Sequence, residues 1–198
     1  DVGLDVGTGF TKIAANWDNS VLQSQDWFRF KQDVQGVQVA LGQRVLNDGD
    51  LVKSAELPEL TIRPSISSAG ETLTFALTPA ISAGETAKPV QVAVTASINQ
   101  CDRMAAEPLD IQGVAAGVLP NEIDIQAALA TCQEAVDRYP EVGRFKFELA
   151  RVLYADGQYA KAEELLVQAN DQGHGRAAQL LGRFYQTGLN GKPDPARA

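Results

Sequence analysis

The chain has 198 residues, of which 44% are apolar, and this is enough for one ordinary domain or two small ones with real cores. Its formal net charge of −8 argues against nucleic acid as the main partner. No apolar run approaches the roughly 20 residues that a membrane-spanning helix needs. The chain starts at Asp1 rather than Met, and residues 193–198 look like the start of another helix. We therefore expect the natural protein to continue beyond this segment.

Residues 1–100 are predicted to form a β-rich domain. Val, Ile, Thr and Phe alternate with polar residues in its apolar runs, so each run can bury one face as a strand. Turn signals that end in glycine, at residues 47–49, 68–70 and 82–84, separate the later runs. Strands at this spacing, without helical patterns between them, favour an antiparallel β-sandwich-like domain or a small barrel. The predicted strands are residues 26–30, 36–41, 60–63, 72–78 and 89–97.

The segment LDVGTGFTK, residues 4–12, has two interpretations. It resembles the first phosphate loop of actin-like ATPases, in which a strand aspartate, a glycine turn and a downstream lysine surround a phosphate. That resemblance implies nucleotide binding from Gly7 to Lys12. However, the family also needs two α/β subdomains and a second phosphate loop, and the strand-like runs that follow leave little room for them. We therefore favour a β-hairpin of residues 2–6 and 10–13, with nucleotide binding as the alternative.

Residues 101–122 are rich in proline and glycine and are predicted to be a connector with a short helix near residues 102–106. Cys101 and Cys132 lie on either side of this connector, and neither belongs to a C-x-x-C pair. The single histidine, His174, leaves no plausible ligand set for zinc. We predict a disulfide between the two cysteines, and two buried free thiols are the alternative.

From residue 123 the apolar residues recur at intervals of three and four, which is the period of an amphipathic helix. Four helices are predicted, with Asp124 as the N-cap of the first and glycines near the ends of the later ones. The fold class is therefore predicted to be α+β. An N-terminal antiparallel β-sandwich-like domain, residues 1–100, is followed by the connector, residues 101–122, and by a short α-helical hairpin repeat array, residues 123–198.

Small residues recur at one spacing in the helical part. Ala128 recurs as Ala162 and Ala135 as Ala169, each 34 residues later (162 − 128 and 169 − 135). Close helix crossings need small side chains, so the recurrence indicates equivalent packing positions. A helical-hairpin period of 34 residues resembles the tetratricopeptide repeat, although Lys146 stands where that pattern has a tryptophan. The second hairpin, from residue 173 onward, looks more like the related Sel-one-like repeat.

The stretch before the repeats carries a second resemblance. The residues CDRMAA at 101–106, GV at 113–114 and ATC at 130–132 resemble leaders found before such repeats in exported bacterial proteins. This resemblance implies a periplasmic or otherwise exported protein, and in such a leader the two cysteines bracket the connector. An oxidising compartment of that kind would suit a disulfide.

Arginines at equivalent positions indicate a binding surface on the repeats. Arg151 follows Leu149-Ala150 and Arg183 follows Leu181-Gly182, so both should occupy the same place on successive first helices. First helices line the concave face of such arrays, where two guanidinium groups could bind a carboxylate. The alternative is that these arginines merely neutralise nearby acidic residues on the helix surface. The predicted partner-binding residues are Arg144, Arg151, Tyr154, Arg183 and Gln186.

These patterns favour a non-catalytic protein–protein interaction or scaffold subunit of a bacterial envelope assembly. We expect protein partners, an envelope or membrane-protein complex among them, and no catalytic, cofactor-binding or metal-binding residues. Residues 1–100 contain no His and no Cys, which leaves few groups for catalysis there. The alternatives are a regulatory repeat fragment of a larger enzyme and an actin-like nucleotide-binding protein.

Overall fold

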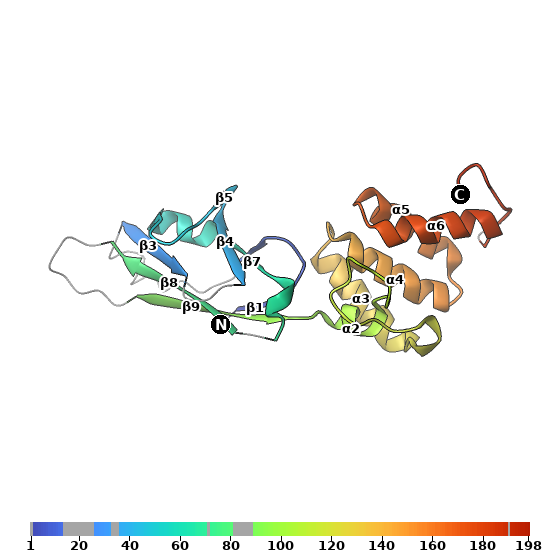
Figure 1. Cartoon of the computed structure of the whole chain (residues 1–198), viewed down its shortest axis with the longest axis horizontal. Helices are drawn as coiled ribbons and strands as arrows, with labels where there is room; N and C mark the ends of the chain where they lie inside the picture. The colour runs from blue at the N-terminus through green and yellow to red at the C-terminus, as the bar shows by residue number, and fades with distance from the viewer. Residues whose placement is uncertain (1, 14–25, 33–35, 71, 81–88, 190) are drawn as a thin grey trace. The chain divides into compact units, whose positions relative to one another are not determined.

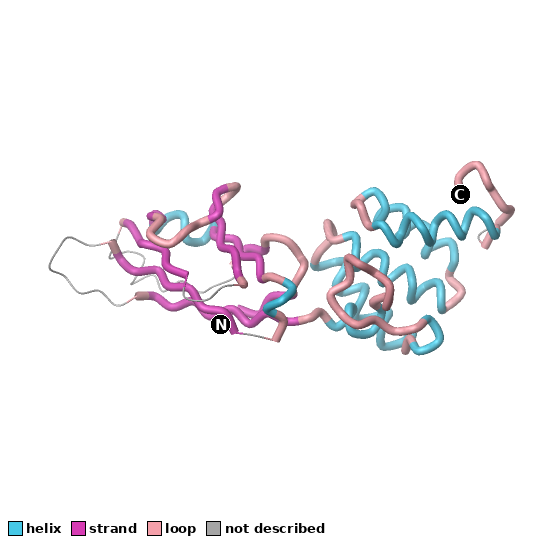
Figure 2. The backbone as a smooth tube through the Cα atoms, in the orientation of Figure 1, coloured by secondary structure: helices cyan, strands magenta, loops and turns pink. Residues whose placement is uncertain are grey.

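The structure is a computed structural model that describes residues 2–13, 26–32, 36–70, 72–80, 89–189 and 191–198. It divides into two compact units, Asp1–Ser97 and Ile98–Ala198. The described elements of the first, the β unit, are strands and short 3-10 helices, and those of the second, the helical unit, are helices (Figures 1 and 2). The α+β fold class is therefore confirmed.

The β unit contains a five-stranded sheet in the order β1-β9-β8-β3-β6. Its neighbouring strands are antiparallel except for β1 and β9, which are parallel, with Val2 opposite Val94 and Asp5 opposite Ser97. The prediction of a purely antiparallel arrangement is corrected at this pair. The strands of this sheet are β1 (Val2–Asp5), β3 (Trp27–Gln32), β6 (Leu51–Lys53), β8 (Thr72–Pro79) and β9 (Val90–Ser97).

A second, four-stranded sheet has the order β2-β7-β4-β5 and is antiparallel throughout. The 3-10 helix η1 (Ser54–Glu59) leads from β6 of the first sheet into β7 of the second. A second 3-10 helix, η2 (Ile66–Ser68), follows β7. The strands of this sheet are β2 (Thr11–Lys12), β4 (Val37–Leu41), β5 (Arg44–Val45) and β7 (Leu60–Pro64).

The longer strands coincide with the predicted runs because alternation gives each of them one buried face. In β3, Phe28 and Phe30 are fully buried, whereas Trp27 and Arg29, which alternate with them, are exposed. The Phe30 ring packs against the Phe75 ring of β8, with 5.6 Å between centroids. The turn signal at residues 82–84 lies outside the described residues.

The predicted hairpin of residues 2–6 and 10–13 is wrong. β1 pairs with β9 in the first sheet, whereas β2 pairs with β7 in the second, so the two strands do not pair with each other. Gly7 and Gly9 adopt left-handed φ angles of 69° and 83°, and between them the chain passes from one sheet to the other. Local alternation identified the strands but could not show which distant strands they pair with.

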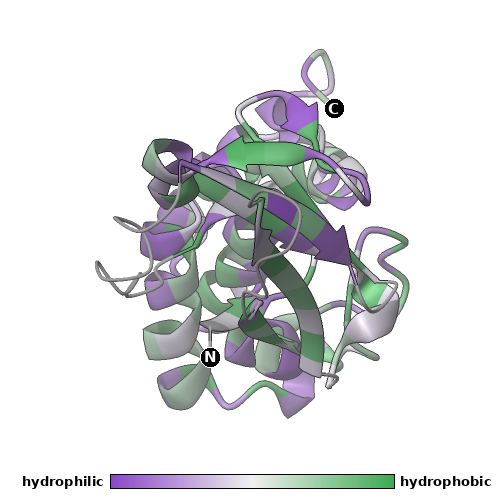
Figure 3. Ribbon diagram, turned by 90° about the vertical axis from the view of Figure 1, so that its left-hand side faces the viewer, coloured by the Kyte–Doolittle hydropathy of each residue, from purple (hydrophilic) through white to green (hydrophobic). Residues whose placement is uncertain are grey.

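The helical unit contains four long helices, α3 to α6, and each packs against the next one along the chain (Figure 1). Hydrophobic and hydrophilic residues alternate in bands along them (Figure 3). Among the described residues, no helix is long and apolar enough to cross a membrane. The helices are α2 (Gln100–Ala105), the 3-10 helix η3 (Pro120–Glu122), α3 (Ile125–Arg138), α4 (Gly143–Ala155), α5 (Tyr159–Asp171) and α6 (Gly175–Thr187).

The repeated alanines lie where the sequence places them. Ala128 and Ala135 of α3 and Ala162 and Ala169 of α5 are all buried in one apolar core. Asp124 caps α3, since its Oδ1 accepts a hydrogen bond from the Ala127 amide at 3.2 Å.

Residues 101–122 belong to the helical unit rather than forming a free connector. The predicted short helix is α2, which packs against α3 and α4. A disulfide joins Cys101 of α2 to Cys132 of α3, as predicted. Residues 107–119, here called the strap, then run back over the helices. At Gly117 a Cβ atom would lie 2.5 Å from the Pro108 nitrogen, so the two ends of the strap approach too closely there for any other residue.

Candidate partner-binding groove

A groove of about 570 Å³ lies between α4 and α6 and is closed on one side by the strap and η3. Both helices contribute polar side chains one to two turns apart, because residues at intervals of three and four share a helix face. Four of the five predicted partner-binding residues, Arg151, Tyr154, Arg183 and Gln186, lie in its lining. Other lining residues include Glu107, Pro120, Phe147, Arg176, Gln179 and Leu180.

The α6 side of the groove is open to solvent. Arg183 and Gln186 are exposed, and Tyr154 of α4 is half-buried opposite them. The Tyr154 ring packs against the Phe184 and Tyr159 rings, with centroids 5.6 and 5.5 Å away. The aromatic packing fixes Tyr154, so this side of the groove presents an ordered aromatic ring beside the exposed Arg183 guanidinium and the Gln186 amide.

Arg151 lines the groove but is not a free donor. Its side chain is buried, with the residue 6% exposed, and it donates hydrogen bonds to the carbonyl oxygens of Ala105 and Val118. Burial lowers the pKa of the guanidinium, and Glu107 and Glu148 oppose that effect. The expected ladder of two equivalent groove arginines is therefore corrected. Arg151 fastens the end of α2 and the later end of the strap to α4, while Arg183 keeps its exposed position.

Arg144 lies outside the groove lining. It is buried, and its Nε donates to Asp102 Oδ1 of α2 at 2.6 Å, with a second bond from Nη2 to Oδ2 at 3.3 Å. Its guanidinium also stacks over the Phe145 ring at 4.5 Å. The prediction that Arg144 contacts a partner is corrected, because its donors are used to hold α2 against α4.

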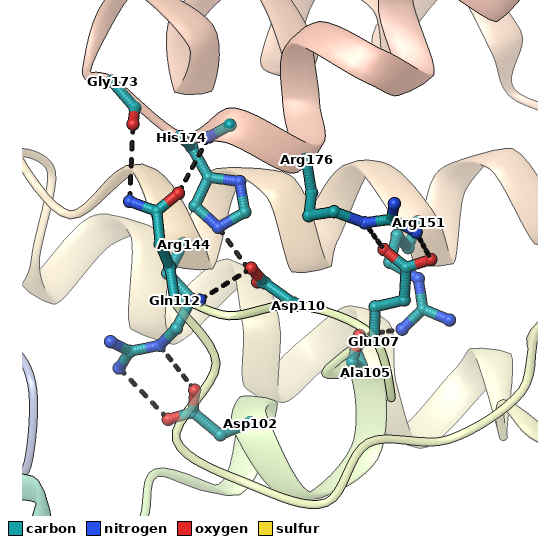
Figure 4. Close-up of polar contacts among 11 residues, drawn as sticks. Asp102, Ala105, Glu107, Asp110, Gln112, Arg144, Arg151, Gly173, His174 and Arg176 are labelled. Carbon is teal, nitrogen blue, oxygen red and sulfur yellow. Dashed lines mark hydrogen bonds and ion pairs between the residues drawn. The ribbon is translucent and has the colours of Figure 1, made fainter.

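An ion pair that the sequence analysis missed joins the strap to the groove. Arg176 Nε of α6 donates to Glu107 Oε2 at 2.7 Å, and Nη2 donates to the other carboxylate oxygen (Figure 4). This bidentate contact raises the pKa of Arg176, chiefly through the hydrogen bonds with Glu107. The two residues are 69 apart in the sequence, so no local pattern could have revealed the pair.

A second strap contact is buried. His174 Nε2 lies 3.1 Å from Asp110 Oδ2, and the imidazole stacks on the Phe147 ring with 4.5 Å between centroids. Burial lowers the pKa of His174, and Asp110 partly offsets this. His174 lies between Gly173 and Gly175, a position typical of an exposed turn, but it is only 3% exposed.

Glu148 of α4 is buried close to these groups. Its pKa is raised well above the usual value, first by burial and then by the Asp102 carboxylate, while Arg144 acts in the opposite direction. The helical unit thus contains a buried set of acidic and basic side chains beneath the strap (Figure 4). Among the described residues, no group of three or more His, Cys, Asp or Glu side chains is arranged to hold a metal ion.

The groove combines positive charge with hydrogen-bond donors on an acidic protein. Among its described lining residues are three arginines and a single carboxylate, that of Glu107. Such a surface can bind a carboxylate or an acidic segment through forked donors.

A family model described as "Tetratricopeptide repeat" matches residues 122–184. This part of the chain is a tetratricopeptide-type repeat. The match covers α3, α4, α5 and most of α6, so the groove helices α4 and α6 both lie within it. Tetratricopeptide repeats generally mediate protein–protein interaction. No curated protein and no solved structure matches the chain.

The tetratricopeptide repeat departs from its family pattern at Lys146, and the structure shows how. Lys146 is buried along its stem, and its Nζ donates to the Pro140 carbonyl at 2.6 Å. Phe145 and Phe147 on either side are fully buried and supply aromatic volume to the core. The repeat therefore accommodates a lysine here by satisfying its ammonium group with a loop carbonyl.

Proposed function

We propose that this protein is a non-catalytic interaction subunit that binds an acidic segment of a partner protein in the groove between α4 and α6. The observation that carries the proposal is the exposed Arg183 guanidinium, which lies in a groove with Tyr154, Gln186 and Arg176. Aromatic and amide side chains beside an exposed arginine provide both contact area and directed donors. The local surplus of arginine in the groove attracts acidic ligands, although the whole chain has a net charge of −8.

A peptide titration tests the groove. A fluorescein-labelled peptide of alternating Glu and Leu is titrated with the intact protein, and its fluorescence anisotropy gives the dissociation constant. Arg183→Glu should weaken binding by about tenfold or more, which corresponds to about 1.4 kcal/mol. Arg138→Glu is the matched control, because it makes the same charge change at an exposed position of α3 outside the groove. Equal binding by wild type and Arg183→Glu would contradict the proposal.

We further propose that the subunit works in an exported bacterial envelope assembly, in the periplasm or outside the cell. Two observations support this context: the resemblance of residues 101–132 to leaders of exported repeat proteins, and the disulfide between Cys101 and Cys132. The Sel-one-like character of the second hairpin is part of the same proposal. Fractionation of the native organism, followed by immunodetection, should place the protein outside the cytoplasm. Recovery only in the cytoplasmic fraction would contradict this assignment.

A further inference from the structure

We propose that the strap is an internal lid on the groove. Its Glu107 carboxylate binds the Arg176 guanidinium until an acidic segment of a partner takes its place. This inference rests on the function proposed above and concerns the regulation of the same groove. In the closed form Arg176 binds Glu107, and in the partner-bound form Arg176 and Arg183 both bind the acidic segment while the strap is released. The lid would thus couple partner binding to the exposure of a new surface.

Polar side chains in the first half of the strap, residues 107–112, contact the start of α6 and the turn before it. Besides the Glu107–Arg176 pair, Gln112 Nε2 donates to the Gly173 carbonyl at 3.3 Å, and the Gly175 amide donates to Gln112 Oε1 at 2.8 Å (Figure 4). Asp110 lies against His174, as described above. The Glu107–Arg176 pair is the contact of these that lies at the groove, and its side chains are 22% and 25% exposed. A ligand in the groove can therefore reach Arg176 without first unfolding the strap.

Burial of apolar side chains does little to hold the strap down. Its three largest aliphatic side chains, Leu109, Ile111 and Leu119, are 75%, 97% and 51% exposed. Glu107, Asp110 and Gln112, which lie between or beside them, point to the helices. Because an incoming carboxylate can take the place of the Glu107 carboxylate on the same donors, Arg176 stays paired during the exchange.

The far side of the strap is fixed, so its release is a local movement. Arg151 donates to the carbonyl of Ala105, the last residue of α2, and to that of Val118 near the end of the strap. The Val118 amide donates to the Ala106 carbonyl at 2.8 Å. The disulfide from Cys101 adds a covalent anchor just before the strap. These contacts hold the base when the tip lifts. Release would expose the side of the tip that faces the helices, where Asp110 and His174 are now buried against each other.

The anisotropy titration with the Glu-Leu peptide tests the lid through the Glu107→Gln variant of the intact protein. Without the competing carboxylate, this variant should bind the peptide about three- to tenfold more tightly than the wild type. Glu134→Gln, which removes one negative charge from an exposed position of α3, is the matched control and should bind like the wild type. Circular dichroism and thermal melting establish that both variants are folded.

Hydrogen exchange gives a readout that binding alone would not move. In the wild type, the Asp110 and Gly113 amides donate to carbonyls within the strap, and the Gly175 amide donates to Gln112. Saturation with the peptide should increase exchange in a proteolytic fragment covering residues 107–119 relative to the unbound protein. Exchange within α3 should stay unchanged.

The outcomes separate the lid from the groove itself. The lid proposal is overturned if Glu107→Gln binds the peptide no more tightly than the wild type. It is also overturned if the peptide leaves hydrogen exchange in the strap unchanged or slows it. If Arg183→Glu weakens binding in the same series, the groove proposal survives that result. If Arg183→Glu binds the peptide as the wild type does, the groove proposal fails, and the lid fails with it.

Discussion

At the scale of single residues, the helical unit contains charged side chains that would be costly if they were unpaired. Asp102 of α2 is completely buried, and Arg144 of α4 is one of its partners. A carboxylate taken out of water loses its hydration, and the guanidinium donors replace it. The pair therefore specifies how α2 packs against α4. Removing one member should destabilise the fold strongly, whereas replacing both members by apolar side chains should change its stability little.

We expect Arg144→Ala to lower the free energy of unfolding by about 3–5 kcal/mol, because it leaves Asp102 buried without its guanidinium. Urea unfolding followed by circular dichroism measures this. The double variant Asp102→Leu with Arg144→Met should recover much of the loss, since neither member of the pair is then left charged. A double variant no more stable than Arg144→Ala would show that the loss comes from packing rather than charge.

The buried histidine predicts a loss of stability in acid. Burial keeps the pKa of His174 below its ordinary 6.5, so the folded state favours the neutral imidazole while the unfolded state is protonated at that value. The stability from the neutral form is present above 6.5 and is lost as the pH falls through the lower folded pKa. Urea unfolding at a series of pH values should therefore show falling stability below about pH 6.5.

His174→Gln should flatten this acid limb, because glutamine does not titrate. If the stability of His174→Gln falls just as steeply below about pH 6.5, groups other than His174 cause the loss.

Glu148 predicts the opposite trend. Its folded pKa is raised by burial and by Asp102, so the protonated form is favoured in the folded state. The corresponding stability is fully present below the ordinary pKa of 4.5 and is lost as the pH rises through the raised value. In Glu148→Gln, which keeps a neutral side chain of similar size, this decline should disappear from the same urea series. If the variant and the wild type decline in parallel, Glu148 is charged in the fold.

At the scale of elements, the sequence predicted what local periodicity determines. The four long helices and the longer strands follow from their apolar spacing, and the predicted bounds of the strands agree with the structure to within a few residues. The parallel pairing of β1 with β9 could not be predicted, because its partners lie about ninety positions apart and no local signal records that pairing. The groove face of α6 could be predicted because it depends only on spacing along one helix. The partners of Arg144, Arg151 and Arg176 could not, because they come from residues 102–118, far away in the sequence.

The close packing of α5 gives a prediction at this scale. Ala162 is fully buried where α5 packs into the core, so Ala162→Leu should overpack the site and lower the free energy of unfolding by about 1–3 kcal/mol. Ala160→Leu places the same side chain at an exposed position of the same helix and is the control. Thermal and urea unfolding of both variants check this, and equal stability of the two would refute the repeat register.

At the scale of the whole molecule, the Cys101–Cys132 disulfide closes a loop of 31 residues that includes the entire strap. Cross-linking a loop of this length restricts the unfolded chain, and its reduction should cost about 3–4 kcal/mol in the free energy of unfolding. Denaturation with and without reductant measures the difference. Alkylation of the native, unreduced protein followed by mass spectrometry should find both thiols blocked from labelling, and labelled cysteines would contradict the pairing.

The parallel pair of β1 and β9 has a consequence for how the chain is synthesised. β1 leaves the ribosome well before β9, the strand that it pairs with, which ends at Ser97. At about 5–20 residues per second, roughly 5–20 s pass before that partner exists. During this interval the nascent β1 is an unpaired strand open to mispairing. The helical unit, built largely from neighbouring helices, has no such wait, so a ribosome-bound chain should acquire it within a few residues of each helix emerging.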